Sequence, residues 1–161
     1  MSAEQVVRRL RSFLFALAGL MAVGTLGELW LAEHVKEPLQ FIPFGLCGLA
    51  LVAVAGAWRW PRPATLWALR GVMALTALGS ALGMYEHLAA NAAFELEIRP
   101  NAMLSAVWLD VLHGAAPLLA PGVLLMMAAV ALAATYAHPA LARPAPPAAE
   151  QGAKRPAGKP A

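Results

Sequence analysis

Four long stretches of almost uninterrupted apolar residues dominate the chain, and short polar segments separate them. They cover residues 12–33, 39–58, 64–87 and 115–137. An α-helix needs about 20 such residues to cross the hydrocarbon core of a bilayer. Runs without period-two alternation exclude the strands of a membrane β-barrel, the other structure that satisfies its backbone in lipid. The pattern predicts an all-α fold, an integral membrane bundle of four helices.

The composition of the chain agrees with a membrane location. Hydrophobic residues make up 60% of the sequence and charged residues 13%, and the mean hydropathy is +0.63. A soluble domain has about 45–50% apolar and roughly 25% charged residues. The one cysteine, Cys47, excludes an internal disulfide. The sequence carries no nucleic-acid motif, so we expect membrane lipids as partners and no nucleic acid.

Lysine and arginine residues are distributed unequally between the two sides of the predicted bundle. They gather in the N-terminal segment 1–11, around the link between the second and third stretches, and after the fourth stretch. Only Lys36 and Arg99 lie on the opposite side. Because positively charged segments stay in the cytoplasm, we expect both chain ends to be cytoplasmic. The layout is similar to that of short four-span proteins of bacteria, which indicates a bacterial inner membrane.

The two ends of the sequence have distinct characters. The first residues resemble a signal peptide, but the apolar run that follows is too long, so we expect a retained first span. Residues 138–161 are rich in proline and alanine and are basic. They lack the apolar residues that a packed core requires, so we expect a disordered cytoplasmic tail that can contact anionic lipid headgroups.

Two short resemblances within the chain suggest a duplicated helical hairpin. Glu33-His34 ends the first stretch and Glu86-His87 ends the third. The segment "HVKEPLQFIP" (34–43) is also similar to "HGAAPLLAP" (113–121), with a different offset that requires an insertion before the second copy. Two such hairpins would share one membrane orientation, as parallel repeats. The match is short, so chance similarity between apolar segments is the alternative.

The inserted segment, residues 88–114, is the predicted outer loop. Arg99-Pro100 disfavours a continuous helix, Asn101 can cap a new helix and Gly114 can end it. Apolar residues between them have helical spacing: Leu104, Val107, Trp108, Val111 and Leu112. We therefore expect a short amphipathic helix at the outer surface. Trp30, Tyr85 and Trp108 would mark the outer membrane interface, and Trp58, Trp60 and Trp67 the inner one.

Acidic residues and histidines gather on the outer side and form the predicted site. Its members are Glu28, Glu33, His34, Glu86, His87, Asp110 and His113. Carboxylates and imidazoles suit zinc or iron, and Asp110 and His113 have a spacing that puts both on one helix face. Adjacent residues point about 100° apart on a helix, which limits Glu33-His34 and Glu86-His87 to one inward residue each. Solvated side chains at the membrane boundary are the alternative to a metal site.

Glu28 is the one acid that lies clearly within a predicted span. A carboxylate at that depth costs a few kcal/mol if it faces lipid. We therefore expect Glu28 to face the bundle and to pair with His87 or His113 of the second hairpin. Gly24 and Gly27 would leave room for the second hairpin to approach.

The sequence favours a role without catalysis. It shows no Ser/His/Asp arrangement, so we do not expect an enzyme. The segment "GSALG" (79–83) allows helices to approach closely, within the protein or between copies, so a homo-oligomer or a membrane partner protein is expected. We predict an accessory or binding bundle. The alternative is a small transporter or metal-handling protein that uses the outer Glu/His patch.

Overall fold

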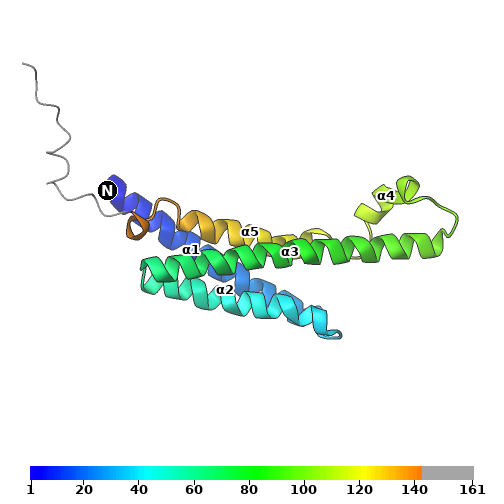
Figure 1. Ribbon diagram of the computed structural model, residues 1–161, viewed down its shortest axis with the longest axis horizontal. Helices are drawn as coiled ribbons and strands as arrows, with labels where there is room; N and C mark the ends of the chain where they lie inside the picture. The colour runs from blue at the N-terminus through cyan, green and yellow to red at the C-terminus, as the bar shows by residue number, and fades with distance from the viewer. Residues whose placement is uncertain (143–161) are drawn as a thin grey trace, which may run out of the picture.

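The helices of the computed structural model follow the apolar stretches of the sequence, and the structure describes residues 1–142 (Figure 1). Its elements are α1 (Ala3–Leu31), the 3₁₀-helix η1 (Pro38–Phe41), α2 (Ile42–Arg59), α3 (Pro63–Ile98), α4 (Leu104–Leu112), α5 (Leu119–Ala134) and the 3₁₀-helix η2 (Pro139–Leu141). Within these residues there is no strand. The predicted all-α class is confirmed.

Local sequence explains where the helices begin. The Ser2 hydroxyl accepts a hydrogen bond from the Gln5 N–H, and the Gln5 side chain accepts one from the Ser2 N–H. This capping box satisfies two N–H groups that a helix start leaves free, so α1 already begins at Ala3. The segment 1–11, predicted as a separate basic terminus, is therefore mostly part of α1. Pro43 and Pro63 lie in the first turns of α2 and α3, where a missing N–H costs nothing.

Helices α1, α2, α3 and α5 lie side by side, and each packs against two of the others. α1 contacts α2 and α5, and α3 contacts the same two helices. We call the end with the start of α1, the α2–α3 turn and η2 the N-terminal end, and the opposite end the α4 end (Figure 1). A two-fold axis that related α1–α2 to α3–α5 would produce this order. The duplication itself stays a prediction.

Small residues allow these helices to approach closely. Buried alanines line the core at Ala18, Ala22, Ala50, Ala57, Ala128, Ala131 and Ala134. In the predicted "GSALG" segment, a Cβ on Gly83 would lie 2.9 Å from Pro121 Cβ of α5, and one on Gly79 would overlap the Leu46 side chain of α2. Between these glycines, the buried Ser80 hydroxyl donates to the Pro121 carbonyl at 2.7 Å. The close approach predicted for this segment thus occurs within the protein.

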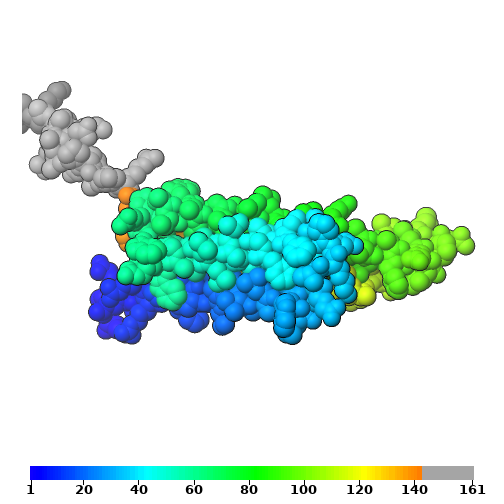
Figure 2. All heavy atoms as spheres, turned by 90° about the horizontal axis from the view of Figure 1, so that it is seen from below, coloured from blue at the N-terminus to red at the C-terminus, as the bar shows by residue number. Residues whose placement is uncertain are grey.

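Helix α3 is much longer than the predicted span 64–87. It has 36 residues, or about 54 Å at 1.5 Å per residue, and it carries α4 beyond the ends of α1 and α2 (Figure 1, Figure 2). The expected loop 88–114 therefore begins as helix. The physical reason is that residues 88–98 contain neither Gly nor Pro, and α4 covers one face of them. The predicted short helix is confirmed as α4, although Met103, not Asn101, is its N-cap.

The apolar helices differ in length. Three are long and apolar enough to cross a membrane: α1, η1 with α2, and α3. Helix α5 is apolar but has only 16 residues, about 24 Å against a hydrocarbon core of about 30 Å. It is shorter than the predicted span 115–137. Pro117 and Pro121 explain its late start, because proline cannot continue a helix that begins earlier.

Candidate functional site

A groove of about 480 Å³ opens between the helices at the α4 end. All four packed helices contribute to it: Thr25, Glu28 and Leu29 come from α1, and Leu46 comes from α2. Gly79, Leu82, Gly83, Glu86, His87 and Ala90 come from α3, and Ala120, Pro121 and Leu124 come from α5. Gly79 and Ala90 are 11 residues apart along α3, so the groove extends over about 16 Å. We call it the α4-end groove.

Gly24 and Gly27 of α1 do not line the groove, and no helix within residues 1–142 packs against them. On α1 the buried alanines end at Ala22, and Gly24 and Gly27 have only open space where a side chain would be. Below this level, buried side chains such as Cys47 and Met73 fill the centre. The expectation that Gly24 and Gly27 receive a neighbouring helix is wrong, and the space that they leave opens outward.

The structure brings four of the seven predicted site residues to this groove. Glu28, His34, Glu86 and His87 line it, together with Glu37, which is not one of the predicted site residues. Glu33, Asp110 and His113 are not among the residues that line it. The acidic patch predicted from the sequence is thus divided between a groove and its surroundings.

Glu33 forms the end of α1. Its φ is 50°, and its N–H donates to the Trp30 carbonyl while the His34 N–H donates to the Leu29 carbonyl. These two bonds and the left-handed residue form a Schellman motif. The carboxylate lies 3.6 Å from Lys36 Nζ, and both side chains are exposed. Such an exposed pair contributes little to stability, so Glu33 has a backbone role at this turn.

Asp110 and His113 serve α4 and its connection to α3. Arg99, which ends α3, donates to Asp110 at 2.7 Å and to Glu95 at 2.5 Å. The hydrogen bond to Asp110, with the charge of Glu95, raises the pKa of Arg99. His113 Nδ1 lies 2.9 Å from the Leu109 carbonyl of its own helix. Both predicted site residues are therefore engaged away from the groove.

The predicted pairing of Glu28 with a histidine is absent. Glu28 is exposed at the groove, and its carboxylate makes no hydrogen bond or ion pair with the residues of 1–142. His87 Nδ1 instead lies 2.9 Å from the Pro117 carbonyl. A carbonyl only accepts, so Nδ1 carries the proton, and in a neutral ring Nε2 can accept. The histidine links α3 to the start of α5, and Glu28 stays free to meet a ligand.

The ligand sets required for a metal ion do not assemble. Within residues 1–142, no three side chains from His, Cys, Asp and Glu lie close enough to hold one. The reason is that Arg99 binds Asp110, His113 stays on its own helix, and Glu33 turns outward with the chain. The zinc or iron predicted for the patch has no site among the described residues.

Thr25 is a groove residue that the sequence did not reveal. It is only 7% exposed and lies three residues before Glu28, on the same face of α1. The buried hydroxyls of Thr76, Ser80 and Thr135 each donate to a backbone carbonyl. Thr25 makes no such bond within residues 1–142, and no fully enclosed side-chain oxygen there lacks a partner. Its hydroxyl therefore keeps a small accessible surface, and the residue lines the groove.

Asn91 is the second residue that the sequence did not reveal. It is 3% exposed, and its Nδ2 donates to the carbonyls of Val111 and Ala116 at 3.0 and 2.9 Å. Its Oδ1 accepts from the Ala116 N–H at 2.9 Å. A Cβ on Gly114 would lie 2.8 Å from Asn91 Cβ. Asn91 thus latches the end of α4 to α3, and Gly114 is needed for their close approach.

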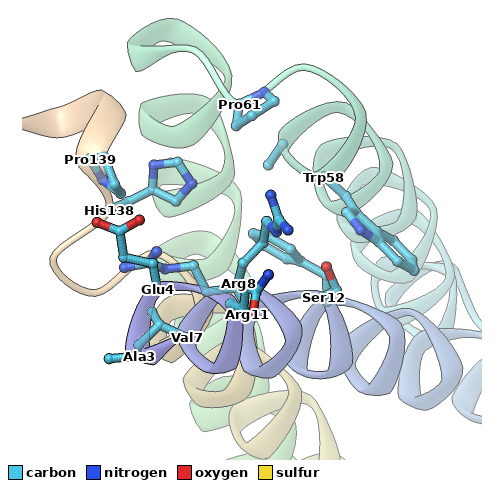
Figure 3. A pocket seen from close by; sticks show the side chains of 13 residues that line it. Ala3, Glu4, Val7, Arg8, Arg11, Ser12, Trp58, Pro61, His138 and Pro139 are labelled. Carbon is cyan, nitrogen blue, oxygen red and sulfur yellow. The ribbon is translucent and has the colours of Figure 1, made fainter. Parts of the chain in front are cut away.

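A second cavity, of about 850 Å³, lies at the N-terminal end between α1, the α2–α3 turn and η2 (Figure 3). Arg8 and Arg11 of α1 lie between His138 on one side and Trp58 on the other (Figure 3). Arg11 donates to the carbonyls of Tyr136 and Ala137 at 3.3 and 3.0 Å. The cavity therefore borders contacts that hold the end of α5 to α1, and its polar groups serve the fold.

Comparisons with protein-family models, with curated proteins and with solved structures find no match to this chain.

Proposed function

We propose that the protein is a small four-span protein of a bacterial inner membrane that acts without catalysis, as an accessory or binding bundle. The observation that carries the proposal is the apolar outer surface of the packed helices. Leu20 of α1, Val52 of α2, Leu78 of α3 and Met126 of α5 are 68%, 74%, 70% and 61% exposed, all near the middle of their helices. A soluble monomer rarely exposes apolar residues on every side, whereas lipid covers them at no cost.

The spacing of exposed aromatic residues supports the same proposal. Trp67 and Tyr85 are 62% and 65% exposed on α3, and they lie 18 residues apart, about 27 Å along the helix. This is close to the roughly 30 Å of a hydrocarbon core, whose two interfaces attract Trp and Tyr. On this placement α5 completes the fourth span with the apolar residues that flank it, and the end of α3 rises above the membrane with α4.

The charges favour cytoplasmic chain ends. In residues 1–142 the arginines of α1, of the α2–α3 turn and of the first turns of α3 belong to the N-terminal end, whereas only Lys36 and Arg99 lie at the α4 end. The α4-end groove would then face away from the cytoplasm. This groove supports a binding role, for a ligand, a second copy or another membrane protein.

Two measurements test the proposal. Alkaline carbonate should leave the protein in the membrane pellet, and its release would contradict an integral location. A fluorescent reporter that folds only in the cytoplasm should be active at the C-terminus, and alkaline phosphatase should be active when inserted at Asn101, between α3 and α4. The opposite pattern would overturn the orientation. Elemental analysis of the purified protein tests the metal-handling alternative, which predicts a stoichiometric metal.

A further inference from the structure

We infer that the α4-end groove binds an amphipathic organic cation, a protonated amine on an apolar body. The inference rests on the proposed membrane location and adds the chemical class of the ligand. The volume of the α4-end groove, about 480 Å³, is in the range of small-molecule sites, roughly 300–1,000 Å³. The walls are mostly apolar, with Leu46, Leu82 and Leu124 at successive positions around the groove.

The charges around the groove select a cation. Glu28, Glu37 and Glu86 line it, and none of the described residues in its lining is Lys or Arg. Glu28 is exposed and has no partner within residues 1–142, so its carboxylate is free to meet a positive group. Apolar walls beside the carboxylates strengthen their attraction for a cation by excluding water.

Hydrogen-bond acceptors in the lining of the groove select a cation that carries N–H groups. Thr25 presents a hydroxyl without a hydrogen bond to residues 1–142, one helical turn below Glu28. His87, held by the Pro117 carbonyl through Nδ1, offers Nε2 as an acceptor in its neutral ring. An ammonium group has three donors and no acceptor, so the Glu28 carboxylate and the Thr25 hydroxyl, three residues apart on one face of α1, can each accept one of its N–H groups. The apolar body of the ligand then packs against the leucines.

Three compounds that differ in one terminal group test the charge selection. They are 4-phenylbutylammonium, the uncharged pentylbenzene and the anionic 5-phenylpentanoate. Binding is measured by calorimetry with the full chain in zwitterionic nanodiscs, and empty nanodiscs supply the partition background. The ammonium compound should bind more tightly than the other two by about tenfold or more, the ratio that corresponds to 1.4 kcal/mol. Equal binding of pentylbenzene would show an acyl-chain site and would overturn the inference, as would no binding of the cation.

Variants of the groove locate the site. Glu28→Gln should weaken binding of the ammonium compound by about fivefold, the upper range for an exposed ion pair. Glu97→Gln, a matched change of an exposed acid on α3 outside the groove, should leave binding unchanged. Equal affinities of these two variants would overturn the assignment to this groove.

The hydroxyl of Thr25 has a separate readout. Thr25→Val should weaken the binding of 4-phenylbutylammonium by about tenfold or more, as the loss of one hydrogen bond to a charged group does. It should not weaken the trimethylammonium analogue, which has no N–H to donate. Equal loss for both compounds would mean a packing effect and would refute the role of Thr25. Carbonate extraction of the same variants keeps the two proposals separate, because an integral protein that binds all compounds alike fails only this inference.

Discussion

Asn91 gives the sharpest test of how α3 and α4 are held together. Its three hydrogen bonds join the middle of the α3 extension to Val111 and Ala116. Each bond contributes about 0.5–1.5 kcal/mol, and unpaired buried groups cost more. Asn91→Ala should therefore lower the free energy of opening α4 by about 2–4 kcal/mol. The four packed helices should keep their stability, because they lie below this contact.

Amide hydrogen exchange measured by mass spectrometry in nanodiscs reports this opening. Exchange in residues 104–118 should accelerate by about 30-fold to 1,000-fold, at tenfold per 1.4 kcal/mol, or until no protection remains. Peptides from α1 and α2 should not change. Asn101→Ala is the matched control, because Asn101 is exposed at the turn before α4 and its side chain bonds none of the residues in 1–142. Equal acceleration in both variants would refute the latch.

A double-mutant cycle with Gly114 extends the test. The Cβ added by Gly114→Ala would lie 2.8 Å from Asn91 Cβ, so the side chain must move and its hydrogen bonds must break. The two single variants should have similar effects. The double variant should lower the free energy of opening α4 by about 2 kcal/mol less than the sum of the two single losses, because the same hydrogen bonds can be lost only once. Additive costs would show that Gly114 acts through something other than Asn91.

Three further predictions concern the N-terminal end. Ala137 has φ 44°, a left-handed conformation that costs an alanine about 1–2 kcal/mol, whereas the flexibility of a glycine there costs about 0.5–1 kcal/mol. Ala137→Gly should therefore raise the free energy of unfolding in detergent by about 0.5–1 kcal/mol. The control Ala133→Gly, within α5, should lower it by about 1 kcal/mol. Arg70→Leu should lower it by about 1–3 kcal/mol, because Arg70 Nη2 donates to the Thr135 carbonyl at 3.1 Å and caps α5. Partial burial and a neighbouring arginine lower the pKa of His138, so the folded state binds a proton less tightly than the unfolded state. The contribution of neutral His138 to the free energy of unfolding is complete above the unfolded pKa near 6.5 and is lost as the pH falls through the folded pKa. The thermal unfolding midpoint should therefore decrease when the pH is lowered from about 7 to about 5, and His138→Gln should make this decrease smaller.

The spacing of apolar residues was sufficient to predict the helices and the position of α4. It could not predict the end of α3, because Asn91, Glu95 and Glu97 interrupt the apolar pattern of residues 88–98, and the packing of this segment against α4 arises only in the folded chain. Asn91 and Glu95 look like solvated residues until the chain folds back and buries them at 3% and 8% exposure. Asn91 bonds Val111 and Ala116, which lie 20 and 25 residues further along the chain, and no local pattern encodes such contacts.

The structure brings only part of the predicted site together. Charge distribution located the acidic end, and Glu28, Glu86 and His87 do line one groove. The spacing of Asp110 and His113 suggested ligands, but Arg99 lies 11 residues before Asp110, too far for a helical pairing rule to detect. Thr25 escaped notice because its significance is a missing hydrogen bond, which only the folded chain can show.

The two ends of the helical array differ in whether their polar groups have hydrogen-bond partners. At the N-terminal end, Arg70 donates to the Thr135 carbonyl directly after α5, and Arg11 donates to the Tyr136 and Ala137 carbonyls that follow. These bonds join the end of α5 to α3 and α1. At the α4 end, the side chains of Thr25 and Glu28 have no hydrogen-bond or ion-pair partner within residues 1–142. Because the contacts at the N-terminal end stabilise the fold, the α4 end can keep polar groups that lack hydrogen-bond partners. A binding groove requires such groups. Substitutions at Arg11 should therefore affect unfolding without changing ligand selection, and those at Glu28 should do the reverse.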